Sequence, residues 1–217
     1  VVLHFEDNLQ EESQLDWIVD LDNNIITSPQ IVYNHSTKKK NIIVQDANKI
    51  TYLIDEKGKE LWRKSLGGKI LDNVSQIDFY KNGKLQYLFN TEDSLYILDR
   101  LGRNVENFPV SLISKAKRGH TLVDYDKNRK YRVLVPSQGG ILYNYSKNGE
   151  QVVGWKFEAM KSPITNKAKY LSISGKDYIY VVDGSGNISV VGRNGKKRVK
   201  VNEIPISEGF YLDNKFG

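Results

Sequence analysis

Residues 55–62 read Asp-Glu-Lys-Gly-Lys-Glu-Leu-Trp, and the glycine and the tryptophan of this stretch recur along the chain at a nearly constant interval. The aromatic position returns after 45, 46 and 47 residues, at Trp17, Trp62, Phe108 and Trp155. The turn glycine follows the same period, at Gly58, Gly102, Gly149 and Gly195. A fixed period of this length is typical of folds that stack one supersecondary unit on the next.

Each unit of the repeat contains four short runs rich in Val, Ile and Tyr, a composition typical of half-buried strands. Asn-Gly pairs such as Asn82-Gly83 bound these runs and readily supply the positive φ angles of tight hairpins. The predicted strands are Ile25–Tyr33, Asn41–Asp46, Ile50–Asp55 and Glu60–Leu66; Gln76–Tyr80, Leu85–Asn90, Ser94–Asp99 and Arg103–Val110; His120–Tyr125, Tyr131–Pro136, Gly140–Tyr145 and Gln151–Phe157; Lys169–Ile173, Asp177–Asp183, Asn187–Gly192 and Lys196–Val201.

Four antiparallel strands in every unit predict an all-β protein, a β-propeller with blades at about 24–66, 70–112, 118–158 and 164–201. A β-sandwich is the rival, but a sandwich requires no internal repeat. Partial blades are expected at both ends, in residues 1–21 and 206–212, with strands at Val1–Phe5, Leu15–Leu21 and Glu208–Leu212. The chain is therefore expected to be a single propeller domain or part of a larger ring.

Composition narrows the possible chemistry. The chain has 217 residues, no cysteine and a net charge of +6, so disulfides, thiolate metal sites and cysteine nucleophiles are excluded. Its apolar runs are too short to cross a bilayer. The chain begins at Val1 rather than at a methionine, and we expect it to be a mature form or a piece of a longer protein.

The stretch Asp55–Trp62 resembles the repeat of quinoprotein alcohol dehydrogenase-like (PQQ-repeat) propellers, and Ser28–Val32 resembles the start of their inner strand. The resemblance implies the non-catalytic branch of that group, which includes the lipoprotein that scaffolds outer-membrane barrel assembly. It therefore implies a periplasmic or extracellular protein of the cell envelope. Quinone-dependent dehydrogenases need groups that grip the quinone, a Ca²⁺ ion and a carboxylate base. The sequence offers no such constellation, so we expect neither enzyme activity nor a cofactor.

A second, weaker resemblance is to the calcium-loop propellers of adhesion proteins. It rests on Thr121–Asn128, in which Asp124, Asp126 and Asn128 place oxygen side chains at alternate positions. Carboxylates spaced in this way in a tight loop can supply several of the oxygens that Ca²⁺ takes. The alternative is a polar hairpin in which Asp and Asn side chains bond to their own backbone.

The four aromatic positions are expected to be structural, with each ring buried between blades and a tryptophan N–H bonded to a backbone carbonyl. Function is expected at loops of one propeller face or at a blade edge that binds a protein partner. The candidate contact segments are Asn34–Lys40, Lys81–Lys84, Asp126–Arg129 and Gly175–Lys176. The basic clusters Lys38–Lys40 and Arg193–Lys200 are expected to be solvated surface rather than a nucleic-acid site.

Overall fold

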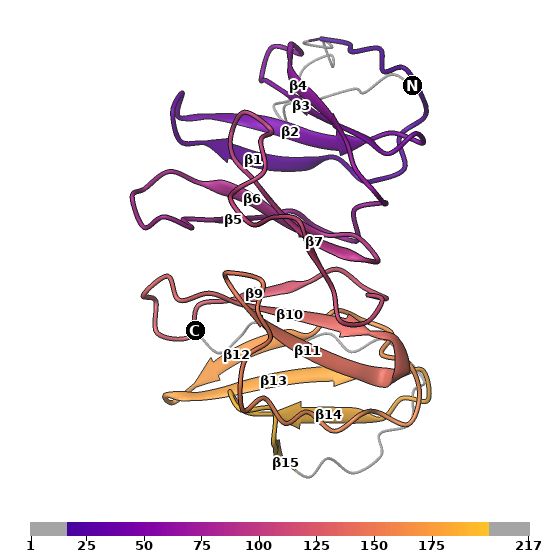
Figure 1. Cartoon of the computed structure of the whole chain (residues 1–217), viewed down its shortest axis with the longest axis vertical. Coiled ribbons are helices and arrows are strands. Elements are labelled where there is room, and N and C mark those ends of the chain that lie inside the picture. Colours follow the sequence, from indigo (N-terminus) through magenta and orange to yellow (C-terminus); the bar gives the residue numbers. More distant parts are fainter. Residues whose placement is uncertain (1–16, 200–217) are drawn as a thin grey trace, which may run out of the picture.

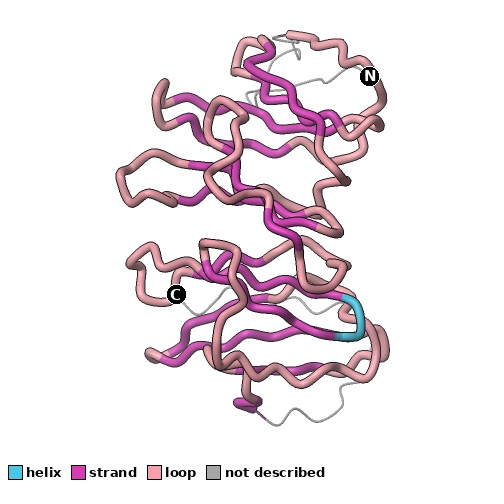
Figure 2. Tube along the Cα trace, in the orientation of Figure 1, coloured by secondary structure: helices cyan, strands magenta, loops and turns pink. Residues whose placement is uncertain are grey.

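The chain folds into four antiparallel β-sheets that follow one another along the long axis of the molecule (Figure 1). The computed structural model describes residues 17–199, so the predicted strands Val1–Phe5 and Glu208–Leu212 lie outside the described residues. Of the predicted strand Leu15–Leu21, residues 17–21 are described, and they belong to no named strand. Between 17 and 199 the strands are joined by loops and one helical turn, η1 (Gln138–Gly140) (Figure 2).

We call the four sheets blades 1 to 4, and their strands follow in simple meander order. Blade 1 contains β1 (Gln30–Asn34), β2 (Lys39–Gln45), β3 (Ile50–Ile54) and β4 (Glu60–Ser65). Blade 2 contains β5 (Ser75–Ile77), β6 (Gln86–Asn90), β7 (Ser94–Leu98) and β8 (Val110–Ser111). Blade 3 contains β9 (Thr121–Val123), β10 (Arg132–Ser137) and β11 (Ile141–Ser146). Blade 4 contains β12 (Lys169–Ile173), β13 (Lys176–Val182), β14 (Ile188–Val191) and β15 (Lys197–Val199).

The all-β class and the repeat of antiparallel sheets are thus confirmed, with four strands in three of the four sheets, but the first strand of blade 1 and the last strands of blades 2 and 3 are much shorter than predicted. The stretch predicted as Arg103–Val110 bends at Asn107, where φ is +67°, so it pairs with β7 only through an isolated bridge at Asn104 and through the short β8. The stretch predicted as Gln151–Phe157 turns at Gly154, where φ is +81°, and leaves a single bridge between Tyr145 and Gln151. Blade 3 therefore has three strands rather than four.

The first predicted strand is shortened for a different reason. The structure starts β1 at Gln30 instead of Ile25, directly after Pro29, which has no N–H to donate to a β-ladder. Ile25 itself forms only an isolated bridge with Asp46.

Buried apolar layers between neighbouring blades form the core. In blade 2, Leu95 and Ile97 pack toward Val133 of blade 3, whereas Leu98 packs toward Leu53 of blade 1. The alternation along β7 thus serves two interfaces at once, as expected for a sheet covered on both faces. A third layer joins blade 3 to blade 4 through residues that include Leu134, Leu142, Ile179 and Val181.

Three of the four repeating aromatic residues, all but Phe108, lie over the repeating glycine of the next blade. The Trp62 ring lies against Gly102, so close that a Cβ added at position 102 would stand 2.8 Å from Trp62 Cδ2. Trp62 Nε1 donates to the carbonyl of Arg100 at 3.0 Å. Trp17 repeats both features one blade earlier, with its ring over Gly58 and its Nε1 donating to the Glu56 carbonyl at 2.9 Å.

The last two units keep the contact but change its details. Val110, rather than Phe108, covers Gly149, and Phe108 is buried in the layer between blades 2 and 3. Trp155 still lies against Gly195, but its Nε1 donates at 2.7 Å to the Leu142 carbonyl of its own blade. The glycine is therefore present in every unit, whereas the side chain that covers it varies.

This contact predicts unequal effects of one substitution at two glycines. Gly102 and Gly83 have φ angles of +77° and +79°, but no atom lies within 4 Å of a Cβ added at Gly83. Gly83→Ala should cost about 1–2 kcal/mol of unfolding free energy, the penalty of a left-handed backbone. Gly102→Ala should cost about 1–3 kcal/mol more, because the added methyl group overpacks against Trp62. Urea unfolding of both variants measures the difference, and equal losses would contradict an interblade role for Gly102.

Candidate functional site

The loops of the four blades form a row on one side of the molecule. The turns β1–β2, β5–β6, β9–β10 and β12–β13 lie on the left in Figure 1, and the antiparallel meander brings the turn after each third strand to the same side. We call this side the hairpin face. It contains the turns Asn34–Lys40, Asp78–Leu85, Asp124–Tyr131 and Ser174–Asp177, with the turns Asp55–Lys59, Asp99–Arg103, Ser146–Glu150 and Gly192–Lys196. The four predicted contact segments all lie in the first set.

An Asp or Asn side chain closes each of the three longer hairpins. Asn34 Oδ1 accepts the N–H groups of Ser36 and Thr37 at 3.0 and 3.3 Å. In blade 2, Asp78 accepts the N–H groups of Asn82 and Gly83, both at 2.9 Å. These bonds satisfy backbone donors that no strand would pair, and they give each turn a defined shape.

Neighbouring hairpins also bond to one another. Leu85 N donates to His35 Nδ1 at 3.0 Å and so joins the hairpins of blades 1 and 2. Arg129 Nη1 of blade 3 lies 3.0 Å from Asp78 Oδ2 of blade 2. Arg193 of blade 4 reaches Asp126 of blade 3, with 2.7 Å between Nη1 and Oδ1. The four hairpins therefore form one connected row.

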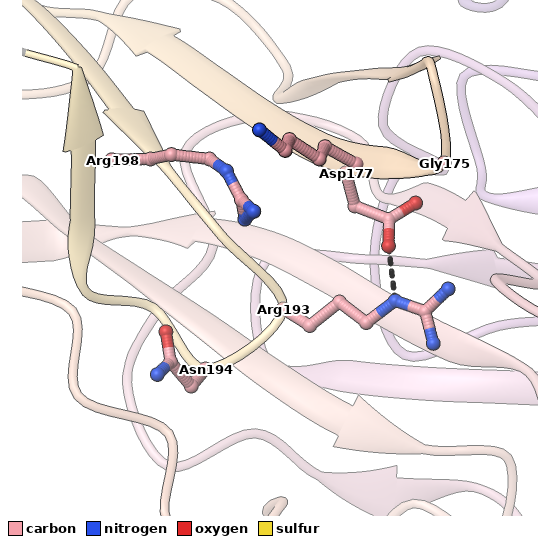
Figure 3. Close-up of a pocket in the computed structure, with 6 residues that line it drawn as sticks. Gly175, Asp177, Arg193, Asn194 and Arg198 are labelled. Carbon is pink, nitrogen blue, oxygen red and sulfur yellow. Dashed lines mark hydrogen bonds and ion pairs between the residues drawn. The ribbon is translucent and has the colours of Figure 1, made fainter.

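The row ends at blade 4 in a hollow of about 440 Å³ between the turns β12–β13 and β14–β15. Figure 3 shows Arg193 and Arg198 projecting from two sides of it, with Asp177 beside Arg193. Its lining residues are Gly175, Lys176, Asp177, Arg193, Asn194 and Arg198. The predicted contact segment Gly175–Lys176 thus forms part of its wall.

Asp177 is the buried carboxylate of this hollow, and its two oxygens have separate partners. Tyr170 Oη donates to Oδ1 at 2.6 Å, and Arg193 Nε donates to Oδ2. Burial raises the pKa of Asp177, but the hydrogen bonds from Tyr170 and Arg193 and the charge of Arg193 outweigh burial and hold the pKa below its usual range. Asp177 is therefore ionised at neutral pH and holds Arg193 in place.

The hairpin face carries a positive local field. The pKa of His35 is lowered first by burial and then by the charges of Arg100 and Lys84. The pKa of Lys147 is lowered by burial and by the charge of Lys81, and its Nζ lies 3.9 Å from the centre of the Phe79 ring. Two titratable groups in different blades, His35 and Lys147, thus feel positive charge from their neighbours.

The predicted Ca²⁺ ligands are all in this row, and each already has a partner within the protein. Asp124 accepts the N–H groups of Asn128 and Arg129 at 3.1 and 2.8 Å. Asn128 Oδ1 accepts the Lys130 N–H at 2.9 Å, and Asp126 pairs with Arg193. This is the bonding of the alternative prediction, a polar hairpin that caps its own backbone. Within residues 17–199, the structure brings no three His, Cys, Asp or Glu side chains together in a metal-binding group.

The sequence alone did not reveal the pairing of Arg193 with Asp126 and Asp177. Arg193 was expected to be solvated surface within the cluster Arg193–Lys200, and the paired residues are 67 and 16 positions apart. The usable signal was the blade repeat, which aligns the turn at Arg193 with the turn at Arg100. It does not indicate which carboxylate an arginine in that turn will reach.

Solved structures that are similar to this chain include the three that follow, whereas no protein-family model and no curated protein matches it. BBS1N in complex with ARL6DN matches with a TM-score of 0.61 and 10% identity, over 84% of this chain and 55% of that chain. BamB from Moraxella catarrhalis matches with a TM-score of 0.57 and 12% identity, over 82% of this chain and 49% of that chain. The Neurospora crassa Pan2 WD40 domain matches with a TM-score of 0.54 and 13% identity, also over 82% of this chain and 49% of that chain.

The class of the protein follows from these matches and from the blade repeat: the fold is a β-propeller. The chain spans about half the length of these three structures. In the part of the chain that the structure describes, no helix is long and apolar enough to span a bilayer.

Arg193 is predicted to stabilise the junction of blades 3 and 4. Arg193→Gln leaves the Asp177 side chain, which is only 6% exposed, without its charged donor, and should cost about 2 kcal/mol of unfolding free energy at pH 7. The Arg193 contribution is present above pH 3.8, the ordinary pKa of the carboxyl, and is lost as the pH falls through the lower folded-state value. Denaturant unfolding of the wild type and of Arg193→Gln at several pH values should therefore show that the difference in their unfolding free energies becomes smaller in acid.

The control for this prediction is Lys197→Gln, which breaks an ion pair with Glu158 whose side chains are 66% and 74% exposed. It should change the unfolding free energy by less than about 0.5 kcal/mol. A loss at Arg193 no larger than the loss at Lys197 would contradict the structural role of Arg193.

The Asp124 hairpin predicts a melting temperature that is indifferent to calcium, because protein donors already occupy its oxygens. Thermal melts with added Ca²⁺ and with chelator should coincide. If chelator instead lowers the melting temperature, and the double substitution Asp124→Ala with Asp126→Ala abolishes the response, the calcium-loop alternative is correct.

Proposed function

We propose that this propeller is a non-catalytic scaffold that binds a protein partner through its hairpin face. The observation that supports this most is the connected row of turns. Because His35, Arg129 and Arg193 each bond to a neighbouring blade, the loops are held in one arrangement before a partner arrives. A preformed surface loses less conformational entropy on binding than separate mobile loops do.

Binding by strand addition at a blade edge has less support. The outer strand β4 carries Arg63, which bonds to Glu60 at 2.6 Å and to Asp22 at 2.5 Å. Charged side chains on an outer strand hinder the approach of another strand. The face is therefore the preferred contact surface in this proposal.

The finer assignments are part of the same proposal. The quinoprotein-like character is supported by the turn Asp55–Lys59, in which Asp55 Oδ1 accepts the N–H groups of Lys57 and Lys59, both at 2.9 Å. Asp99 repeats this bonding with Leu101 and Arg103. A location in the cell envelope or outside the cell rests on that resemblance alone. The alternatives are a Ca²⁺-stabilised adhesion module and, with less support, a quinone-dependent enzyme.

Affinity capture with variants of each face tests this proposal. The hairpin-face variant carries Lys81→Glu, Lys84→Glu and Lys127→Glu, and the control variant carries Lys49→Glu, Lys69→Glu and Lys161→Glu on the opposite side. We expect the wild type and the control variant to capture the same partner from a native extract of the source cell. The hairpin-face variant should lose that partner. Retention by both variants, or equal loss from both, would contradict a binding role for this face.

A further inference from the structure

In the hollow of blade 4, the side-chain oxygens of the lining residues already accept hydrogen bonds from within the protein. Both oxygens of Asp177 accept hydrogen bonds, from Tyr170 and from Arg193, and Asn194 Oδ1 accepts the Lys196 N–H at 3.1 Å. The side-chain oxygens of the lining are therefore engaged, and the lining side chains that remain for a ligand, Lys176 and Arg198, are N–H donors.

Of the three cations in the hollow, only Arg193 has an ion pair among residues 17–199. Arg193 is committed to Asp177 and Asp126. In the part of the chain that the structure describes, neither Lys176 nor Arg198 has a carboxylate partner, and both are exposed. Arg198 nevertheless has a defined position, because its guanidinium lies over the Tyr178 ring, 5.3 Å from the ring centre. A positioned guanidinium with no ion pair among the described residues is suited to bidentate binding of a carboxylate.

The same imbalance extends along the hairpin face. Its carboxylates at Asp78, Asp126 and Glu56 are paired with Arg129, Arg193 and Lys39. Exposed lysines that have no ion pair among residues 17–199 stand in three neighbouring turns, at Lys81, Lys84, Lys127, Lys130 and Lys176. On the opposite side, the acidic pair Glu92-Asp93 is matched by Lys115 and Lys117. Lys49, Lys69 and Lys161 on that side are also exposed and without an ion pair among residues 17–199. The hairpin face is therefore distinguished by the hollow and its positioned Arg198 rather than by unpaired lysines as such.

We propose that the hollow binds a carboxylate of an acidic segment in the protein partner, between Lys176 and Arg198. This inference rests on the proposed function and adds the chemistry of the partner. The rest of the segment follows the row of lysines toward blade 2. Complementary charge of this kind speeds association and selects against basic partners.

The aromatic residues around the hollow favour an acidic protein segment over a nucleic acid. Single-stranded nucleic acids bind through bases stacked on free aromatic rings beside a basic groove. Here Arg193 covers the Tyr125 ring at 4.7 Å, and Arg198 covers the Tyr178 ring. Tyr170 meets the Tyr125 ring edge-on, with 5.5 Å between their centres.

Fluorescence anisotropy with three labelled probes tests the inference on the full chain. The probes are a short peptide of Asp, Glu, Gly and Ser, the same peptide with Asn and Gln in place of the acids, and an oligothymidylate of similar length. At about 50 mM salt, where screening is modest, the acidic peptide should bind and the amide peptide should not. Failure of the acidic peptide to bind, or tighter binding of the oligothymidylate, would overturn the inference.

Paired variants locate the binding. Lys176→Gln with Arg198→Gln removes the two unpaired cations of the hollow, and Lys69→Gln with Lys161→Gln makes the same change in charge at exposed positions on the opposite side. The hollow variant should bind the acidic peptide at least about tenfold more weakly, the effect of losing charge-assisted hydrogen bonds. The control variant should bind like the wild type. If both double variants bind the acidic peptide equally more weakly than the wild type, the effect is one of overall charge, and the proposed site in the hollow is wrong.

The experiment also separates this inference from the proposed function. All four substituted side chains are exposed, so unchanged thermal melts should show that both variants fold. If the partner captured through the hairpin face is also captured by the hollow variant with undiminished affinity, the scaffold proposal stands and the carboxylate site is wrong.

Discussion

The rest of the structure depends on the contact between a side chain of one blade and the turn glycine of the next. Trp17 over Gly58 and Trp62 over Gly102 are its complete forms, with the ring on the glycine and the indole N–H on a nearby carbonyl. Only a residue without a Cβ leaves room for the ring, and the left-handed φ of the turn favours the same residue. One constraint thus sets the spacing of the blades, their register and the period of the sequence.

Because successive blades are held in register, their hairpins meet along one side. Short polar bridges then cross from blade to blade, such as Arg129 to Asp78 and Arg193 to Asp126. These bridges pair Asp78 and Asp126 with arginines, while most lysines of the row have no ion pair among residues 17–199. The charge of the hairpin face therefore follows from how the blades are fastened together. The fold supplies a shaped, positively charged surface, and the proposed function is what such a surface can do.

The architecture was predictable because it repeats. The period of the aromatic and glycine positions gave the class, the strand order and most of the strands. The period misleads at Asn107 and Gly154, where positive φ angles turn the backbone. The predicted strands Arg103–Val110 and Gln151–Phe157 are shorter in the structure for this reason. The turns that the sequence proposed as contacts do lie together, but the hollow was not predictable. The hollow depends on Arg193 reaching two carboxylates in different hairpins, Asp126 and Asp177. Pairs between residues so far apart do not recur with the period of the sequence, so the repeat does not predict them.

The central claim is that the hairpin face is one preformed surface rather than a set of independent loops. Amide hydrogen exchange of the native protein, resolved by NMR, tests it most directly. The informative amides are those of Gly83, Leu85 and Arg129, which donate to Asp78, His35 and Asp124. The account predicts that they exchange slowly, with protection approaching that of the strand amides of β6 and β10. Exchange at the rate of an unstructured chain would show that the loops open independently and would contradict the account.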